Sequence, residues 1–194
     1  MCAVMSEKIT LNFKPKAVTK RLLSVLTKRG ADVIENRYGL GAKATRMTLD
    51  AIGKKYDITR ERVRQIENHS LSIIRKSKEY KDLRTVFDEL KAVVMELGGI
   101  VSEKDLLKHL SKDFPTQNHI HFLLVIGEEF IREKEDEEFK HRWHVDPDLA
   151  KKIHNALRKL YSKLSDDELV LESDLVDDFL EEVKDMNEKY KNEE

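Results

Sequence analysis

The stretch TLDAIGKKYDITRERVRQIE, residues 48–67, decides the fold of the first half of the chain. It holds two helix-length patterns joined by a turn at Asp57. Thr48 and Thr59 stand at the two helix starts, where a threonine side chain can accept a hydrogen bond from a free backbone N–H group. Gly53 lets two helix backbones approach closely, and aspartate tolerates the left-handed conformation that a tight turn often needs. The stretch therefore predicts a helix-turn-helix.

The second helix of this motif has an inward and an outward face by helical periodicity. The inward stripe comprises Val63, Ile66, Ser70 and Ile73 or Ile74. The outward face comprises Arg60, Glu61, Arg64, Gln65 and Asn68. Arginine can pair with guanine, glutamine with adenine, and glutamate can accept from cytosine, so this set at a helix start is typical of major-groove reading. The alternative is an ordinary solvated helix face.

Two further helices are predicted before the motif. Pro15 suits the first turn of a helix with an apolar stripe, and a second helix begins at Thr27 or Lys28 and stops at the Gly-Leu-Gly of residues 39–41. With the motif they make a compact four-helix unit over residues 15–79. Charged residues reach 38%, with only seven glycines and three prolines, which also favours a mainly α protein.

Residues 80–147 are predicted to form a winged helix, which is three helices followed by a β-hairpin. The signals are an apolar helix that stops at Gly98-Gly99, helix caps at Ser102 and Thr116, and alternating segments at 130–134 and 139–145 around an acidic tip. Residues 1–14 are an N-terminal arm. The expected fold class is thus mainly α: a four-helix unit ending in a helix-turn-helix, a winged helix and a helical tail.

The helical tail, residues 148–194, repeats part of the winged-helix pattern. LKAVVMELGGIVSEKDLLKHL (90–110) and LRKLYSKLSDDELVLESDLVDDFL (157–180) share apolar and acidic positions when small insertions are allowed. Two interpretations stay open. The tail is the start of a second winged helix, or generic helix-turn-helix patterning produces the similarity.

Charge is distributed unevenly along the chain. Residues 1–80 hold 18 lysines and arginines against 8 aspartates and glutamates, whereas the counts are 10 against 15 in residues 81–147 and 8 against 14 in residues 148–194. A basic first segment joined to acidic ones indicates a polyanion-binding module with a tail that has another task, since phosphates repel acidic segments. The alternative is a drift of charge without functional meaning.

The stretch RYGLGAKATRMTLDAIGKKYDITRERVRQIENHSLSIIR, residues 37–75, closely resembles region four of bacterial primary sigma factors, which recognises the −35 promoter element. The resemblance covers about residues 17–77. It implies that Arg60, Glu61, Arg64 and Gln65 contact bases or the adjacent backbone. It also implies that Arg62, Thr48 and Leu49 lie against phosphates. Region four docks on the β flap of RNA polymerase, and the corresponding surface here lies around Leu23 to Tyr38.

Three departures from the sigma pattern qualify this resemblance. His69 and Ser72 replace usual basic residues, and Gly30 replaces a usual acidic one. Fewer phosphate contacts imply weaker binding and a shallower salt dependence. The aromatic-rich regions with which sigma factors open promoter DNA are absent, so this chain is not expected to initiate transcription alone.

Residues 84–145 are similar to the HARE-HTH winged helix found in the delta subunit of bacterial RNA polymerase. The similarity depends on ELGGIVSEKDLLKHL (96–110) and the wing that follows. The third helix carries Gln117, Asn118, His119 and His121 but little positive charge. Because the wing tip is also acidic, a contact with protein is preferred over a contact with phosphates.

The sequence gives little support for metal binding or enzymatic activity. His119 and His121, or His141 and His144, invite a metal interpretation, but no cysteine is near and residues 141 and 144 would face opposite sides of a strand. The Glu-x-Lys of EEVK, residues 181–184, fits a nuclease motif only by coincidence, and the carboxylate run 166–168 is more simply solvated. We therefore expect no enzyme, no cofactor and no metal.

The single Cys2 and the lack of an apolar run long enough for a membrane indicate a cytoplasmic protein, and the resemblance to sigma region four implies a bacterial one associated with the nucleoid. The leading hypothesis is a sequence-specific transcription regulator that binds double-stranded promoter DNA at a −35-like element and contacts RNA polymerase at the β flap. The alternative is a polymerase-associated interaction protein, similar to the delta subunit, with secondary DNA binding.

Overall fold

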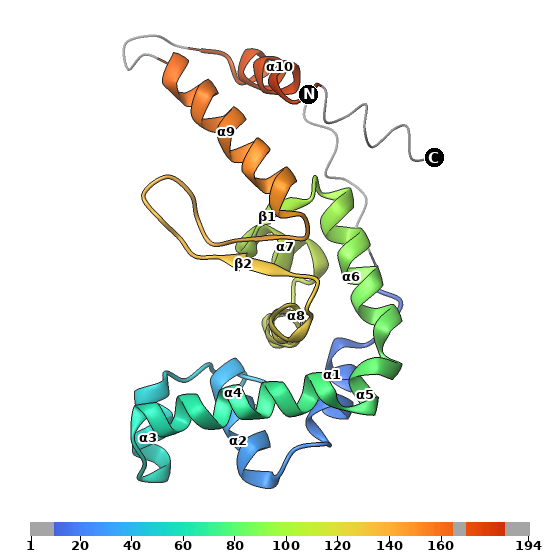
Figure 1. The fold of residues 1–194 in the computed structure, drawn as a ribbon, viewed down its shortest axis with the longest axis vertical. Helices are drawn as coiled ribbons and strands as arrows, with labels where there is room; N and C mark the ends of the chain where they lie inside the picture. The colour runs from blue at the N-terminus through green and yellow to red at the C-terminus, as the bar shows by residue number, and fades with distance from the viewer. Residues whose placement is uncertain (1–9, 165–169, 185–194) are drawn as a thin grey trace. The chain divides into compact units, whose positions relative to one another are not determined.

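The computed structural model describes residues 10–164 and 170–184, and in this part of the chain it is mainly helical with one small sheet (Figure 1). The first helices are α1 (Pro15–Leu23), α2 (Lys28–Tyr38), α3 (Leu49–Tyr56), α4 (Arg60–Lys76), α5 (Lys78–Asp82) and α6 (Arg84–Glu96). The later elements are β1 (Ile100–Ser102), α7 (Glu103–Leu110), α8 (Phe114–Ile126), β2 (Ile131–Glu133), β3 (Arg142–His144), α9 (Pro147–Lys163) and α10 (Glu172–Glu182). The predicted mainly α fold class is confirmed.

The chain divides into two compact units, residues 1–145 and residues 146–194. The predicted boundary between sequence modules at residues 79 and 80 lies inside the first unit and stays a prediction about modules. No helix in the described residues is both long enough and apolar enough to cross a membrane.

Both predicted threonine caps of the helix-turn-helix are present. The Thr48 side chain accepts a hydrogen bond from the Ala51 backbone N–H at 3.1 Å, which satisfies one free donor at the start of α3. The Thr59 side chain accepts a hydrogen bond from the Arg62 N–H, also at 3.1 Å, and satisfies one free donor at the start of α4. The sequence signal and the structure agree here because a cap depends on neighbouring residues only.

The turn between α3 and α4 takes the backbone conformation that the sequence predicts. Asp57 is left-handed, with φ of 52°, and the Ile58 N–H donates to the Gly53 carbonyl at 3.0 Å. A Cβ atom on Gly53 would lie 2.7 Å from the Ile58 carbonyl oxygen, closer than side chains tolerate. The turn thus needs a residue without a side chain at position 53.

The segment predicted to be a winged helix, residues 80–147, contains the predicted hairpin, β2 and β3, and one further strand, β1. The three strands form an antiparallel sheet in the order β1-β3-β2, and Trp143 on the central strand pairs with Val101 of β1 and Arg132 of β2. The strand β1 is only three residues long, so it is too short to show an alternating pattern in the sequence.

The start of α8 differs from the prediction. Asp113, not Thr116, is the N-cap, and its carboxylate accepts from the Thr116 N–H at 3.0 Å and from the Thr116 hydroxyl at 2.6 Å. Pro115 lies in the first turn, where its missing N–H costs nothing. The predicted cap is therefore wrong by three residues, because Thr116 supports the true cap from inside the helix.

Helix α8 is the centre of the first unit. It packs against α1, α2, α4 and α7, and Figure 1 shows it end-on between the α1, α2 and α4 layer and the sheet. Ile120, Phe122, Leu123 and Leu124 on α8 are fully or almost fully buried. One apolar core runs from Val18 on α1 to Trp143 on β3, so the four-helix half and the winged-helix half of the unit share it.

The second unit consists, in the described residues, of α9 and α10. The Glu182 carboxylate of α10 accepts from the Lys159 ammonium at 2.7 Å and from the Lys163 ammonium at 3.0 Å, so the two helices are linked by charge. The tail is helical as predicted, and the second winged helix stays a prediction. Cys2 and residues 166–168 lie outside the described residues.

Candidate nucleic-acid interface

The four residues predicted to read bases lie together on the first two turns of α4. Arg60, Glu61, Arg64 and Gln65 occupy one face of the helix, since they are spaced i, i+1, i+4 and i+5, and all four are exposed. We call these four residues the reading face. Its position at the free end of the second helix of a helix-turn-helix is the one that enters a major groove in proteins of that kind.

Hydrogen bonds within α4 order the reading face. Arg64 donates to both carboxylate oxygens of Glu61, at 2.8 and 2.7 Å, and Gln65 donates to the same carboxylate at 3.5 Å. The hydrogen bond from Arg64 is the main cause that lowers the pKa of Glu61, and it raises the pKa of Arg64 in return. Both side chains therefore remain charged near neutral pH.

The other predicted contact residues surround the reading face. The Arg62 guanidinium donates to the Gln65 side chain at 3.1 Å, and the Arg60 guanidinium lies 4.0 Å from the Asp50 carboxylate on α3. Thr48 is exposed at the start of α3, whereas Leu49 is half-buried against the small apolar cluster of the helix-turn-helix. The structure thus brings the starts of α3 and α4 together on one side.

A buried glutamate that the sequence did not predict, Glu67, joins the inward side of α4 to α2. Glu67 is 8% exposed, accepts a hydrogen bond from the Tyr38 hydroxyl at 2.9 Å and lies 3.4 Å from the Arg37 guanidinium. Burial, followed by the Glu67 charge, raises the pKa of the Tyr38 hydroxyl. The position of Glu67, four residues after Val63 on the inward stripe, was the sequence signal that could have predicted its burial. Its contacts with Tyr38 and Arg37 join α4 to α2.

Gly30 explains one departure from the sigma pattern. It is buried where α2 meets α4, and a Cβ atom there would lie 2.9 Å from the Ser70 hydroxyl oxygen. A side chain at position 30 would require the Ser70 hydroxyl on α4 to turn away. The glycine therefore fits the close packing of the two helices.

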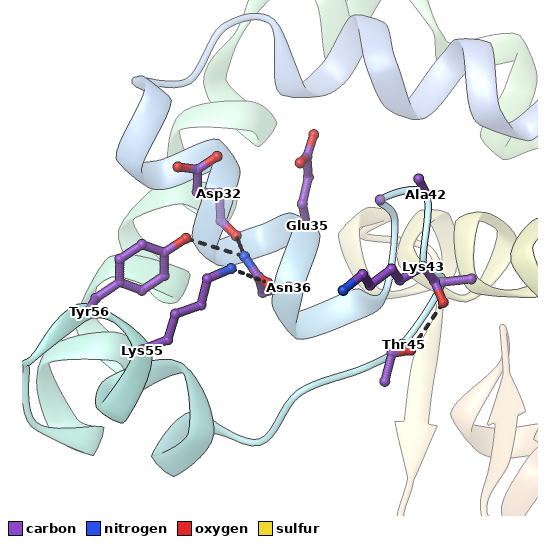
Figure 2. A pocket seen from close by; sticks show the side chains of 10 residues that line it. Asp32, Glu35, Asn36, Ala42, Lys43, Thr45, Lys55 and Tyr56 are labelled. Atoms are coloured by element: carbon purple, nitrogen blue, oxygen red, sulfur yellow. Dashed lines mark hydrogen bonds between the residues drawn. The ribbon is translucent and has the colours of Figure 1, made fainter.

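A polar cavity of about 330 Å³ lies beside the helix-turn-helix (Figure 2). Its lining mixes both charges, from Asp32 and Glu35 on α2 to Lys43 and Lys55. The Lys55 ammonium donates to the Asn36 side-chain oxygen at 2.9 Å, a bond drawn in Figure 2. No residue of the reading face lines this cavity.

The third helix of the winged-helix half is turned inward. Asn118, His119 and His121 on α8 are buried, and the half-buried Gln117 donates to the Ser111 carbonyl at 2.7 Å. These side chains therefore contact other parts of the chain, and a contact of residues 84–145 with another protein stays a prediction. A helix buried in this way cannot enter a DNA groove.

The surface expected to face the polymerase flap is also covered. Leu23, Ile34 and Tyr38 on α1 and α2 are at most 8% exposed, and the Tyr38 ring meets the Phe122 ring of α8 at 5.2 Å between centroids. The apolar side chains of this surface belong to the core of the first unit.

The histidine pairs considered as metal ligands have other neighbours. His141 accepts a hydrogen bond from the Glu135 N–H at 2.7 Å, and the His144 ring lies 3.2 Å from the Glu133 carboxylate. Among the described residues, no group of three or more His, Cys, Asp or Glu side chains is close enough to hold a metal ion. Glu182, in the EEVK segment, is taken by Lys159 and Lys163.

Comparison with known proteins agrees with the geometry of the helix-turn-helix. Residues 22–76 match the family described as Sigma-70, region 4. A stretch of 71 residues is 41% identical to the RNA polymerase sigma factor RpoD of Neisseria gonorrhoeae, and it makes up 37% of this chain but only 11% of that protein. The resemblance to sigma region four is thus confirmed for this segment. The resemblance of residues 84–145 to HARE-HTH stays a prediction.

Proposed function

We propose that this chain is a sequence-specific DNA-binding transcription regulator that reads a −35-like promoter element. The observation that carries the proposal is the reading face: Arg60, Glu61, Arg64 and Gln65 are exposed together at the start of α4, in a segment that matches Sigma-70, region 4. The activity is binding rather than catalysis.

Each part of the interface has a proposed task. The arginines and Gln65 reach base edges, while Glu61 accepts from cytosine or holds Arg64 in place through its paired hydrogen bonds. Arg62 and the start of α3, Thr48 and Leu49, lie along the phosphate backbone. Phosphate contacts set the register of a protein on DNA, whereas base contacts supply the specificity.

The distribution of charge supports DNA binding by residues 1–80 rather than by the wing. The surplus of ten positive charges in residues 1–80 attracts the duplex, and the acidic wing tip at residues 135–138 is repelled by it. DNA is therefore expected to approach the first unit from the helix-turn-helix and not from the wing.

RNA polymerase is the second proposed partner, since the similar RpoD protein carries the name of an RNA polymerase sigma factor. Burial argues against a contact through Leu23, Ile34 and Tyr38, which belong to the core that α1 and α2 share with α8, whereas Val25 and Leu26 are half-buried. We therefore rank DNA reading above polymerase docking, and only polymerase binding through the buried residues Leu23, Ile34 and Tyr38 would require α8 to move away.

Mobility shift of the full chain with two labelled duplexes tests the proposal. One duplex carries a −35-type sequence, and the other carries the same bases scrambled. Specific proteins typically bind their site at least about 10³-fold more tightly than other DNA at physiological salt, and the departures at His69 and Ser72 should weaken binding to both duplexes alike. Equal affinity for the two duplexes at every salt concentration would contradict sequence reading.

A further inference from the structure

Exposed apolar side chains are concentrated in the second unit. Of the described residues, eight large apolar side chains are exposed, and only Phe114 and Ile131 belong to the first unit. The other six are Tyr161, Leu164, Val170, Leu171, Val176 and Leu180. Six of the eight exposed apolar side chains thus lie within residues 161–180. Contact with water is unfavourable for so many neighbouring apolar side chains, and such surfaces mark interaction sites.

The periodicity of these residues shows why the second unit leaves them uncovered. Ile153, Leu157 and Leu160 form a half-buried stripe along α9 at i, i+4 and i+7, whereas the exposed Tyr161 lies beside this stripe and the exposed Leu164 follows the end of the helix. On α10, Val176 and Leu180 follow each other at i and i+4, with exposed fractions of 43% and 47%. Two helices cannot cover apolar residues on both sides of their contact, so a further layer is needed to complete a core.

The charges of the two helices indicate what supplies that layer. Helix α9 carries five lysines and arginines and one aspartate, whereas α10 carries six acidic residues and no basic one. Nucleic acid would be repelled by α10, and a partner of one charge sign would be repelled by one helix or the other. A surface with both signs side by side is complementary to itself, as a two-fold contact requires.

We propose that α9 and α10 form a two-fold interface with the same two helices of a second copy of this chain. In this arrangement the basic α9 of each copy lies against the acidic α10 of the other, and the exposed apolar residues close a four-helix core between them. The pairing of Lys159 and Lys163 with Glu182 stays within each copy.

Sedimentation equilibrium of the full chain over a range of concentrations tests this interface. The wild type should show a monomer–dimer equilibrium, and the double variant Tyr161→Asp/Leu180→Asp should raise the dimer dissociation constant at least about tenfold. The matched control Phe114→Asp/Ile131→Asp changes two equally apolar exposed residues outside the interface and should leave it unchanged. A wild type that stays monomeric, or a control that acts like the test variant, would overturn the proposal.

A charge exchange separates a specific two-fold contact from unspecific association. Lys151→Glu/Arg158→Glu reverses charge on α9 on the side of Tyr161, and Asp177→Lys/Glu181→Lys reverses it on α10 on the side of Leu180, at positions that are exposed. Each variant alone brings like charges together and should be largely monomeric. Mixed in equal amounts, they should form a mixed dimer, because each helix then meets its opposite charge. Failure of the mixture to associate would refute the arrangement, and circular dichroism of each variant confirms that α9 and α10 are still helical.

Discussion

Asn118 donates a hydrogen bond from its side-chain nitrogen to the backbone carbonyl of Ala44 at 2.7 Å, although the two residues are 74 positions apart in the chain. The same nitrogen donates to the Gly39 carbonyl at 3.1 Å, and the side-chain oxygen accepts from the Arg46 guanidinium at 2.7 Å. One fully buried asparagine on α8 thus holds the loop that leads into α3.

Asn118→Ala should lower the free energy of unfolding by about 1–3 kcal/mol, because it leaves the buried carbonyls of Gly39 and Ala44 without a donor. Urea unfolding followed by circular dichroism measures the change. Asn155→Ala, at an exposed position on α9, is the control and should be nearly neutral. Equal effects of the two variants would contradict the role of Asn118.

Gly53→Ala should destabilise the first unit by about 1–3 kcal/mol, since the added methyl group meets the Ile58 carbonyl at 2.7 Å and forces α3 and α4 apart. Gly41→Ala is the matched control, because a Cβ atom there has no neighbour within 4 Å. The control should be neutral or stabilise by up to about 1 kcal/mol. Thermal unfolding of both variants measures these changes in stability. A Gly53→Ala variant as stable as the wild type would contradict the prediction, because the turn would then accommodate the methyl group.

Arg60→Ala should lose about 1–3 kcal/mol of discrimination at one or two base pairs, since its guanidinium reaches base edges in the proposed complex. Arg62→Ala should weaken binding to all duplexes alike and reduce the salt slope, because it removes a phosphate contact. Fluorescence anisotropy with a panel of singly substituted −35-type duplexes measures both effects. If both variants bind every duplex less tightly by the same factor, the assigned roles are wrong.

Glu103 should make the first unit sensitive to acid. Burial alone would raise the pKa of this carboxyl, but the His121 ring nitrogen 3.6 Å away and the hydrogen bonds from Arg132 outweigh burial and hold the pKa well below its usual range. Arg132 donates to both oxygens, at 2.6 and 3.1 Å, and the Trp143 ring nitrogen donates at 3.0 Å. The folded state therefore favours the ionised form.

The sign of the effect follows from proton linkage. The unfolded chain takes up a proton on Glu103 near pH 4.3, the usual value for glutamate, whereas the folded chain does not until the pH is far lower. The stabilisation by Glu103 is present above that pH and is lost as the pH falls below it. Glu103→Gln should lose less stability than the wild type between about pH 5 and pH 3 in urea titrations. Glu137→Gln on the exposed wing tip should keep the acid dependence of the wild type, and identical acid profiles for all three proteins would exclude this role for Glu103.

The helix-turn-helix was predictable because its signals are local. Thr48, Thr59, Gly53 and Asp57 each act on residues within five positions, and the structure uses all four as the sequence predicts. Elements that depend on distant partners were not predictable in the same way. The strand β1 exists only because β3 lies beside it, and Glu67 is buried only because Tyr38 and Arg37 supply a donor and a charge.

The sequence by itself determined the reading face, because helical periodicity alone puts Arg60, Glu61, Arg64 and Gln65 on the side opposite the apolar stripe of α4. Only the tertiary structure decided that α8 turns its polar residues inward. That helix has no distinct apolar face, so its own pattern cannot say which side is covered. The answer comes from the α1 and α2 surface packed on it and from the Gly39 and Ala44 carbonyls that Asn118 meets. The polar residues near the start of α8 are therefore buried against other parts of the chain, whereas those of the reading face at the start of α4 are exposed.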